Sequence, residues 1–168
     1  TDYAYEIKMR YLIKYSGLKI IFFFGLIACS VVSVIAQPAN DNCTGAIVLP
    51  QTCPPTAATV GTTAGSTDGW AGSPGCQQSG NPEVWYTFTS TGTSGTFTVT
   101  NVTQAGVIEF ILVTGTGCAS TFTSVNITCG ASPLTVTAAL VAGQQYWVTI
   151  SARTSEGTFN ICLNVTSP

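Results

Sequence analysis

The stretch at residues 81–88, N-P-E-V-W-Y-T-F, most constrains how this chain can fold. Its apolar residues Val84, Tyr86 and Phe88 recur with a period of two, and Trp85 falls on the opposite face of the same strand. The proline near its start disfavours helix, because it fixes its own φ and biases the preceding residue towards extended backbone. The stretch therefore predicts a β-strand with one face in a hydrophobic core.

The rest of the chain repeats this pattern of short β-branched and aromatic runs separated by Gly, Ser, Pro or Asn. We expect about eight strands, from a short apolar run at residues 46–49 followed by strands at 56–63, 81–88, 95–101, 107–114, 121–128, 134–140, 145–152 and 158–165. No amphipathic helical period with caps occurs beyond the N-terminal region. Short strands at this spacing predict an all-β fold, a β-sandwich or jelly-roll-like domain of about eight strands.

The first 36 residues differ from the remainder, because four of the five basic residues of the chain precede an apolar run at residues 20–35. The run ends in V-I-A before Gln37 and Pro38, which is the layout of a cleaved signal peptide. We expect a signal helix within residues 1–36 and a single disulfide-bonded sandwich at 37–168.

Two alternatives to cleavage after Ala36 stay open. Residues 18–36 are nearly long enough for a transmembrane anchor. The sequence L-I-A-C ending at Cys29 resembles a bacterial lipobox, which would make Cys29 a lipidated first residue and attach the protein to a membrane.

Beyond Ala36 the chain carries five acidic residues and one basic residue, Arg153, so its formal charge is −4. One arginine cannot release the counterions on which binding to phosphates depends. We therefore expect no nucleic-acid partner.

The same region contains no His and no Lys, so neither base can activate a Ser or Thr hydroxyl. We expect no enzyme and no cofactor. A carboxylate-only glycoside hydrolase is a weaker alternative, because that chemistry needs only two acids. Glu109 interrupts an apolar run and would need a partner if it were buried, and Arg153 is the cation available for a structural ion pair.

Aromatic residues are better candidates for a ligand site. Strict alternation places Trp85 and Trp147 on the face opposite the core, where they could stack on a sugar or dock a protein. A loop or the first strand could instead cover them. Trp70 and Asp68 lie in a glycine-rich segment at residues 61–80, and we expect Trp70 to be the most exposed tryptophan, either contacting a ligand or pinning this segment to the domain.

Six cysteines remain once Cys29 is set aside, and an even number in an exported chain favours disulfides. Zinc is the rival interpretation. The region has no His and no C-x-x-C pair, so the spacing of a structural zinc site is missing and we expect no metal.

Six short motifs in order resemble the bacterial pre-peptidase C-terminal-like domain and its relatives in secreted Bacteroidota proteins. They are N-D-N-C at 40–43 with Ala46, V-W-Y-x-F at 84–88, G-T-F at 95–97, G-x-x-C at 115–118 with Cys129, A-G-Q-x-Y-x-V at 142–148, and G-T-F at 157–159. The resemblance implies a β-sandwich that is appended to secreted enzymes and surface proteins and is not itself an enzyme. Relatives often carry Asn and Asp after the second cysteine of the pair, whereas Cys129 is followed by G-A-S, so calcium coordination is not expected.

We predict a bond between Cys118 and Cys129, which are near in sequence, flank one strand and match the paired positions of the family. Three pairings remain for the other four cysteines. We favour Cys43 with Cys76, which would anchor the glycine-rich segment, and Cys53 with Cys162, which would tie the leading and final strands together.

These observations together predict a non-catalytic binding or adhesion module, secreted or at the cell surface and accessory to a larger protein. Its partner would be an extracellular glycan or protein. The alternative is a purely structural spacer domain.

Overall fold

The computed structural model of the chain describes residues 36–53, 58–67, 70, 76, 81–118, 121–152 and 155–167. The chain divides into two units, Thr1–Val34 and Ile35–Pro168. The first unit, with the expected signal helix and Cys29, lies outside the described residues. The fold below is that of the second unit.

Nine strands and one short 3₁₀ turn, η1, are present in the described residues. They are η1 (Cys43–Gly45), β1 (Ile47–Val48), β2 (Thr59–Thr62), β3 (Glu83–Thr89), β4 (Ser94–Thr100), β5 (Ile108–Thr114), β6 (Thr123–Gly130), β7 (Leu134–Ala139), β8 (Gln145–Ala152) and β9 (Thr158–Thr166).

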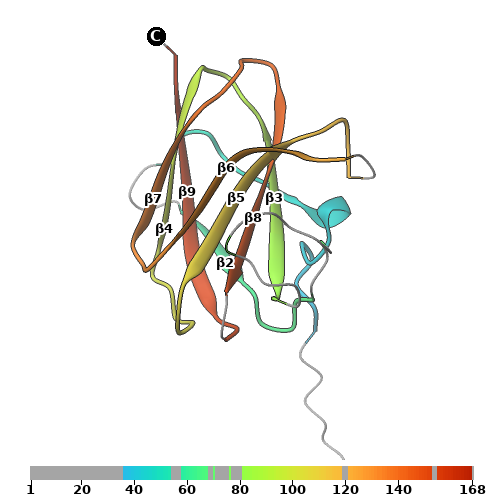
Figure 1. Cartoon of the computed structure of the whole chain (residues 1–168), viewed down its shortest axis with the longest axis vertical. Coiled ribbons are helices and arrows are strands. Elements are labelled where there is room, and N and C mark those ends of the chain that lie inside the picture. Colours follow the sequence, from blue (N-terminus) through green and yellow to red (C-terminus); the bar gives the residue numbers. More distant parts are fainter. Residues whose placement is uncertain are drawn as a thin grey trace, which may run out of the picture. The chain divides into compact units, whose positions relative to one another are not determined.

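The strands form two sheets (Figure 1). The five-stranded sheet has the order β1-β3-β8-β5-β6, and the four-stranded sheet has the order β2-β9-β4-β7. Every pairing is antiparallel except that of β1 with β3. The prediction of an all-β sandwich is confirmed, and the two-residue β1 lies within the short apolar run expected at residues 46–49.

The hydrophobic core lies between the two sheets. It contains the residues that recur with a period of two on the facing sides of the strands, including Val84, Tyr86 and Phe88 on β3 and Phe97 on β4. Burial of such side chains is the main favourable term in folding. The predicted core face of residues 81–88 is confirmed.

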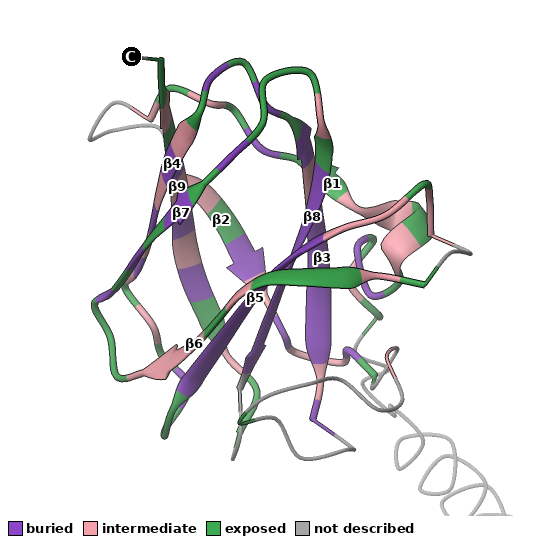
Figure 2. Cartoon of the chain, turned by 45° about the horizontal axis from the view of Figure 1, so that its top comes forward, coloured by how far each residue is buried: buried purple, intermediate pink, exposed green. Residues whose placement is uncertain are grey.

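Strands β3, β5 and β8 are buried on both faces over most of their length, as the purple colour in Figure 2 shows. On β5, all six residues from Ile108 to Val113 are buried. One face of these strands contacts the core, and the other face is covered by segments outside the sheet. This second face, which we call the outer face, carries the candidate site.

The N-terminal segment, which includes β1, runs along the edge of β3 opposite β8. The backbone N–H of Trp85 donates to the Asn40 carbonyl at 2.8 Å, and the Leu49 N–H donates to the Thr87 carbonyl at 2.9 Å. These bonds satisfy edge groups that would otherwise be open to pairing with another chain. They also fix the start of the domain beside the outer face.

Tyr86 is fully buried in the core, and its hydroxyl makes no hydrogen bond with a described residue. Burial raises the pKa of Tyr86 to about 12. The side-chain amide of Asn40 lowers the pKa of Tyr86, but by less than burial raises it. In the structure this amide donates a hydrogen bond to the Trp85 carbonyl. A buried hydroxyl without a partner costs free energy.

We predict that Tyr86→Phe leaves the free energy of unfolding at pH 7 unchanged or raises it by up to about 1 kcal/mol, because it removes this unsatisfied hydroxyl. The difference should grow between pH 10 and pH 12. There the unfolded wild-type tyrosine is ionised while the folded one is not, so rising pH favours unfolding of the wild type alone. Urea denaturation across this pH range measures both effects, and a loss of stability at pH 7 would contradict the prediction.

Gly61 provides a related prediction, because a Cβ at this position would overlap the Tyr86 hydroxyl and the Phe159 ring. Gly61→Ala should therefore lower the free energy of unfolding by about 1–3 kcal/mol. Combining it with Tyr86→Phe should recover part of this loss, since the hydroxyl is the nearest atom. Additive effects of the two substitutions would show that the predicted overlap does not occur.

Candidate functional site

Strand register brings three polar residues side by side on the outer face. Glu83 on β3 pairs with Ser151 on β8, and Ser151 pairs on its other side with Glu109 on β5. Their side chains share a face because adjacent strands in register point paired residues to the same side. The three residues are 0, 1 and 4% exposed. We call Glu83, Ser151 and Glu109 the acidic row.

An aromatic cluster lies next to the acidic row on the same face. It consists of Trp85, Trp147, Trp70 and Phe122, with Ile111 and Val113 of β5 beneath them. The Trp70 ring lies 5.8 Å from that of Trp85 and 5.5 Å from that of Phe122, and the Phe122 and Trp147 rings are 5.5 Å apart, between centroids. These are the separations of favourable tilted and edge-to-face aromatic contacts.

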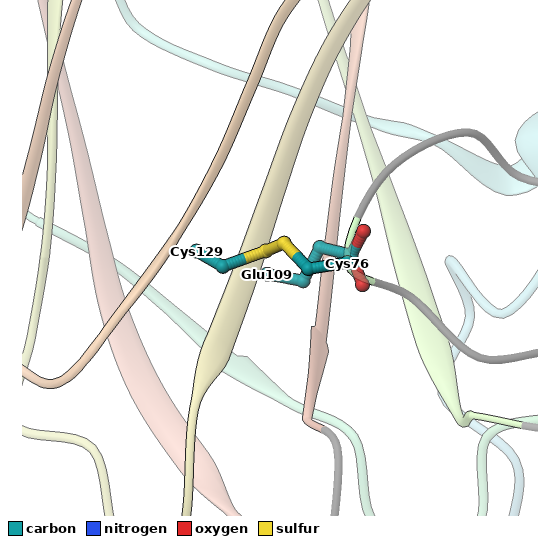
Figure 3. A group of neighbouring side chains, drawn as sticks. All are labelled: Cys76, Glu109 and Cys129. Carbon is teal, nitrogen blue, oxygen red and sulfur yellow. A yellow bond between two sulfur atoms is a disulfide. The ribbon is translucent and has the colours of Figure 1, made fainter.

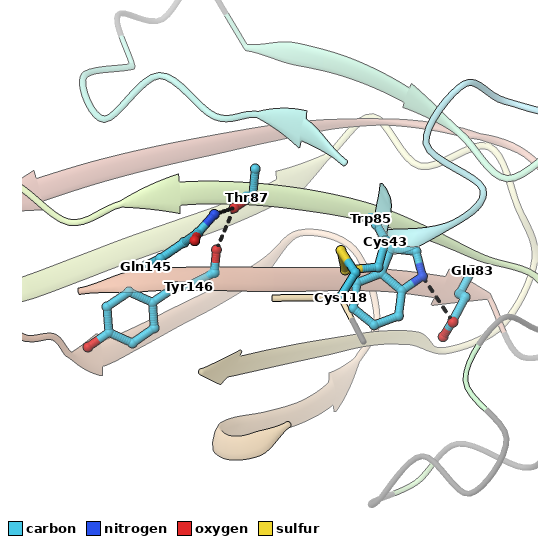
Figure 4. Close-up of a disulfide and its surroundings, with 7 residues drawn as sticks. All are labelled: Cys43, Glu83, Trp85, Thr87, Cys118, Gln145 and Tyr146. Carbon is cyan, nitrogen blue, oxygen red and sulfur yellow. Dashed lines mark hydrogen bonds between the residues drawn. A yellow bond between two sulfur atoms is a disulfide. The ribbon is translucent and has the colours of Figure 1, made fainter. Parts of the chain in front are cut away.

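One hydrogen bond connects the aromatic cluster to the acidic row. Trp85 Nε1 donates to Glu83 Oε1 at 3.1 Å (Figure 4). A buried carboxylate is costly without such donors, so this bond offsets part of the cost of placing Glu83 beneath the covering segments.

The disulfide Cys43–Cys118 lies beside the Trp85 ring (Figure 4). Its Cα atoms are 5.5 Å apart, and it joins the η1 turn to the loop between β5 and β6. Cys43 and Ala46 pack against the aromatic cluster. The bond therefore holds the N-terminal segment over the outer face.

A second disulfide, Cys76–Cys129, lies beside the acidic row (Figure 3). Cys129 on β6 is paired in register with Glu109 on β5. The two sulfur atoms and a carboxylate oxygen of Glu109 lie within 4.8 Å of one another. Cys76 belongs to the glycine-rich segment, so this bond attaches that segment to the sheet.

The third disulfide, Cys53–Cys162, confirms one predicted pairing and joins the segment before β2 to the last strand. The predicted bond between Cys118 and Cys129 is wrong. Cys118 lies in the loop that precedes β6 and Cys129 lies near the far end of β6, an eight-residue strand that spans about 25 Å. A disulfide needs Cα atoms within about 7 Å of each other.

The predicted bond between Cys43 and Cys76 is wrong for a similar reason. Cys43 is bonded to Cys118, which follows the end of β5, whereas Cys76 is bonded beside Glu109, near the start of β5. Cys43 and Cys76 are therefore bonded at opposite ends of the outer face.

The predicted tryptophans do come together on one face. Trp85 and Trp147 are 2 and 3% exposed, so the interpretation in which other segments cover them is confirmed, and the interpretation in which they form an exposed surface does not hold. Trp70 is half-buried and thus the most exposed of the three, as predicted. Asp68 and Arg153 lie outside the described residues, and with them the expected Glu109–Arg153 ion pair.

Sequence reasoning missed Phe122 and Glu83. Glu83 could have been found, since it precedes Trp85 by two residues and so shares its face. Phe122 gave no such signal, because it lies in a loop and reaches the cluster only through the turn between β5 and β6.

Comparison with known proteins adds no assignment: neither protein-family models nor curated proteins match this sequence. The similarity to the pre-peptidase C-terminal-like domain therefore stays a prediction. Three disulfides indicate an oxidising, extracellular environment. Within the described part of the chain, no helix has the length and apolar character needed to cross a membrane.

We predict that Trp85→Phe lowers the free energy of unfolding by about 1.5–3 kcal/mol beyond the loss expected from the smaller buried area of the phenylalanine ring. The additional loss arises because the buried carboxyl group of Glu83 loses a hydrogen-bond donor. Trp147→Phe is the matched control. Trp147 is equally buried and packs in the same cluster, where its ring contacts Phe122. Equal losses in the two variants, measured by urea denaturation, would show that the bond to Glu83 contributes nothing.

Proposed function

We propose that this domain is a non-catalytic binding or adhesion module, secreted or displayed at the cell surface, and that it contacts an extracellular glycan through Trp70. The observation that carries the proposal is that Trp70 is partly exposed while its ring packs on the buried ring of Trp85 and on the half-buried ring of Phe122. An aromatic ring held in this way offers a fixed flat surface at low entropic cost.

The charge distribution supports the same class of partner. Five acidic residues and a single basic one beyond Ala36 disfavour polyanions, including nucleic acids and acidic polysaccharides. A neutral sugar can instead stack its apolar face on an indole ring and hydrogen-bond to nearby polar groups. A protein partner fits the same surface less specifically.

The proposal is tested by binding of residues 37–168 to a glycan array and to insoluble polysaccharides. We expect retention on at least one neutral polysaccharide, and an affinity about five- to thirtyfold weaker for Trp70→Ala, since one stacked ring contributes on the order of 1–2 kcal/mol. Trp70→Phe should retain part of the affinity.

Val60→Ala is the control for this experiment, because Val60 is 71% exposed on β2 of the other sheet. It should bind as the wild type does. If the wild-type domain binds no glycan on either platform, the spacer alternative is favoured. If Trp70→Ala binds normally, the ligand contact lies elsewhere.

A carboxylate-only glycoside hydrolase is the second candidate, and the acidic row is the observation that favours it. Glu83 on β3 and Glu109 on β5 are separated by β8, so their backbones lie roughly 9.6 Å apart. This distance is near the wider separation of the two carboxyl groups in inverting glycosidases. Both side chains are almost fully buried, however, so a substrate could reach them only after the covering segments moved.

The hydrolase candidate predicts turnover of glycosides by the wild-type domain that is lost in Glu83→Gln and in Glu109→Gln. Absence of turnover on a broad glycoside panel would exclude it and would leave the binding proposal unaffected. Turnover that survives both substitutions would indicate a contaminating enzyme.

A further inference from the structure

The strongest unassigned feature of the domain is the group formed by Cys76, Cys129 and Glu109. It brings two sulfur atoms and a carboxylate oxygen within 4.8 Å of one another, from two neighbouring strands and the glycine-rich segment (Figure 3). It does not depend on the proposed glycan site. The two cysteines have an oxidised and a reduced form. Their sulfur atoms are bonded to each other in the structure and would become free thiols on reduction.

We propose that the Cys76–Cys129 disulfide, once reduced by an extracellular dithiol, becomes a zinc site in which both thiolates and the Glu109 carboxylate bind one Zn²⁺ ion. Zinc takes thiolate and carboxylate ligands together, at about 2.3 Å to sulfur and about 2.0–2.2 Å to oxygen. The Cα atoms of the two cysteines are 6.6 Å apart, so small side-chain rotations bring the three ligands around one ion.

Accessibility favours this disulfide as the one that is reduced. Cys76 is exposed, whereas the other five bonded cysteines are all half-buried. A dithiol attacks the exposed Cys76 sulfur and forms a mixed disulfide, and the Cys129 sulfur leaves as a thiolate. Closure of the dithiol to its own disulfide then releases the Cys76 sulfur, so that two electrons and two protons pass from the dithiol to the pair.

Charge favours a metal in the reduced form. Deprotonation of the two thiols places two like charges close together beside Glu109, and a divalent cation offsets both of them. Binding of Zn²⁺ to the two thiols releases their two protons to solvent. The region beyond Ala36 contains no His, so the fourth position would be filled by water.

The consequence for the fold is that the glycine-rich segment stays attached to β6 in both forms. The disulfide holds Cys76 to Cys129 in an oxidising environment, and Zn²⁺ would hold the same two residues in a reducing one. The segment that carries Trp70 thus keeps its anchor to the sheet.

The test uses residues 37–168 treated with a limiting amount of dithiothreitol and freed of reductant under argon. Alkylation followed by mass spectrometry should show Cys76 and Cys129 modified before the other four cysteines. Titration should show one Zn²⁺ bound per chain in the reduced protein and none in the oxidised protein. Substitution of Co²⁺ should give a thiolate-to-metal charge-transfer band, whereas Ca²⁺ should not bind.

Two variants make the result specific to this group. Glu109→Gln keeps both cysteines and should weaken Zn²⁺ binding at least tenfold, with circular dichroism to confirm folding. Glu156→Gln, which changes an exposed carboxylate, should bind as the wild type does. The proposal is overturned if the reduced protein binds no Zn²⁺ at micromolar concentration, if another disulfide is reduced first, or if Glu109→Gln binds Zn²⁺ as tightly as the wild type.

Discussion

Burial of the outer face of the five-stranded sheet is the constraint on which the rest of this structure depends. That face carries the large aromatic rings of Trp85 and Trp147 and the carboxylates of Glu83 and Glu109. Exposed rings of this size would form an apolar patch, and buried carboxylates need hydrogen-bond donors. The face therefore requires a cover that is both apolar and polar, and the sheet itself cannot supply one.

The cover is built from segments that have little hydrophobic core of their own. The η1 turn, the glycine-rich segment and the loop after β5 contribute single apolar residues to the face, chiefly Ala46, Trp70 and Phe122. Segments of this kind lose more conformational entropy on ordering than their few contacts return. Disulfides shift that balance by restricting the unfolded chain, and two of the three bonds fix covering segments.

The sequence predicted the sheets well because alternation is a local property. Period two placed Val84, Tyr86 and Phe88 in the core and put Trp85 and Trp147 together on the opposite face. It could not say whether that face met water, because the answer lies in segments that carry no regular period. The two interpretations left open for Trp85 and Trp147 therefore differed in the cover and not in the strands.

The disulfide pairings failed for a related physical reason. Proximity along the chain suggested a bond between Cys118 and Cys129. The strand between them is extended, however, and the distance between its two ends is larger than in a helix with the same number of residues. The pairing that succeeded, Cys53 with Cys162, was inferred from which strands must meet. Cysteine pairing in a sandwich thus follows sheet order, and sheet order is set by non-local contacts that strand spacing alone does not determine.

The cover also determines what the outer face can do. Trp85 packs in the aromatic cluster and donates to Glu83, so the apolar and acidic halves of the face are coupled through one side chain. A ligand at Trp70 would bind on a layer whose ordering depends on Cys43–Cys118 beneath it and on Cys76–Cys129 beside the acidic row. Breaking either bond with nothing in its place would raise the free energy of ordering these segments, and a ligand that bound at Trp70 would have to offset that cost.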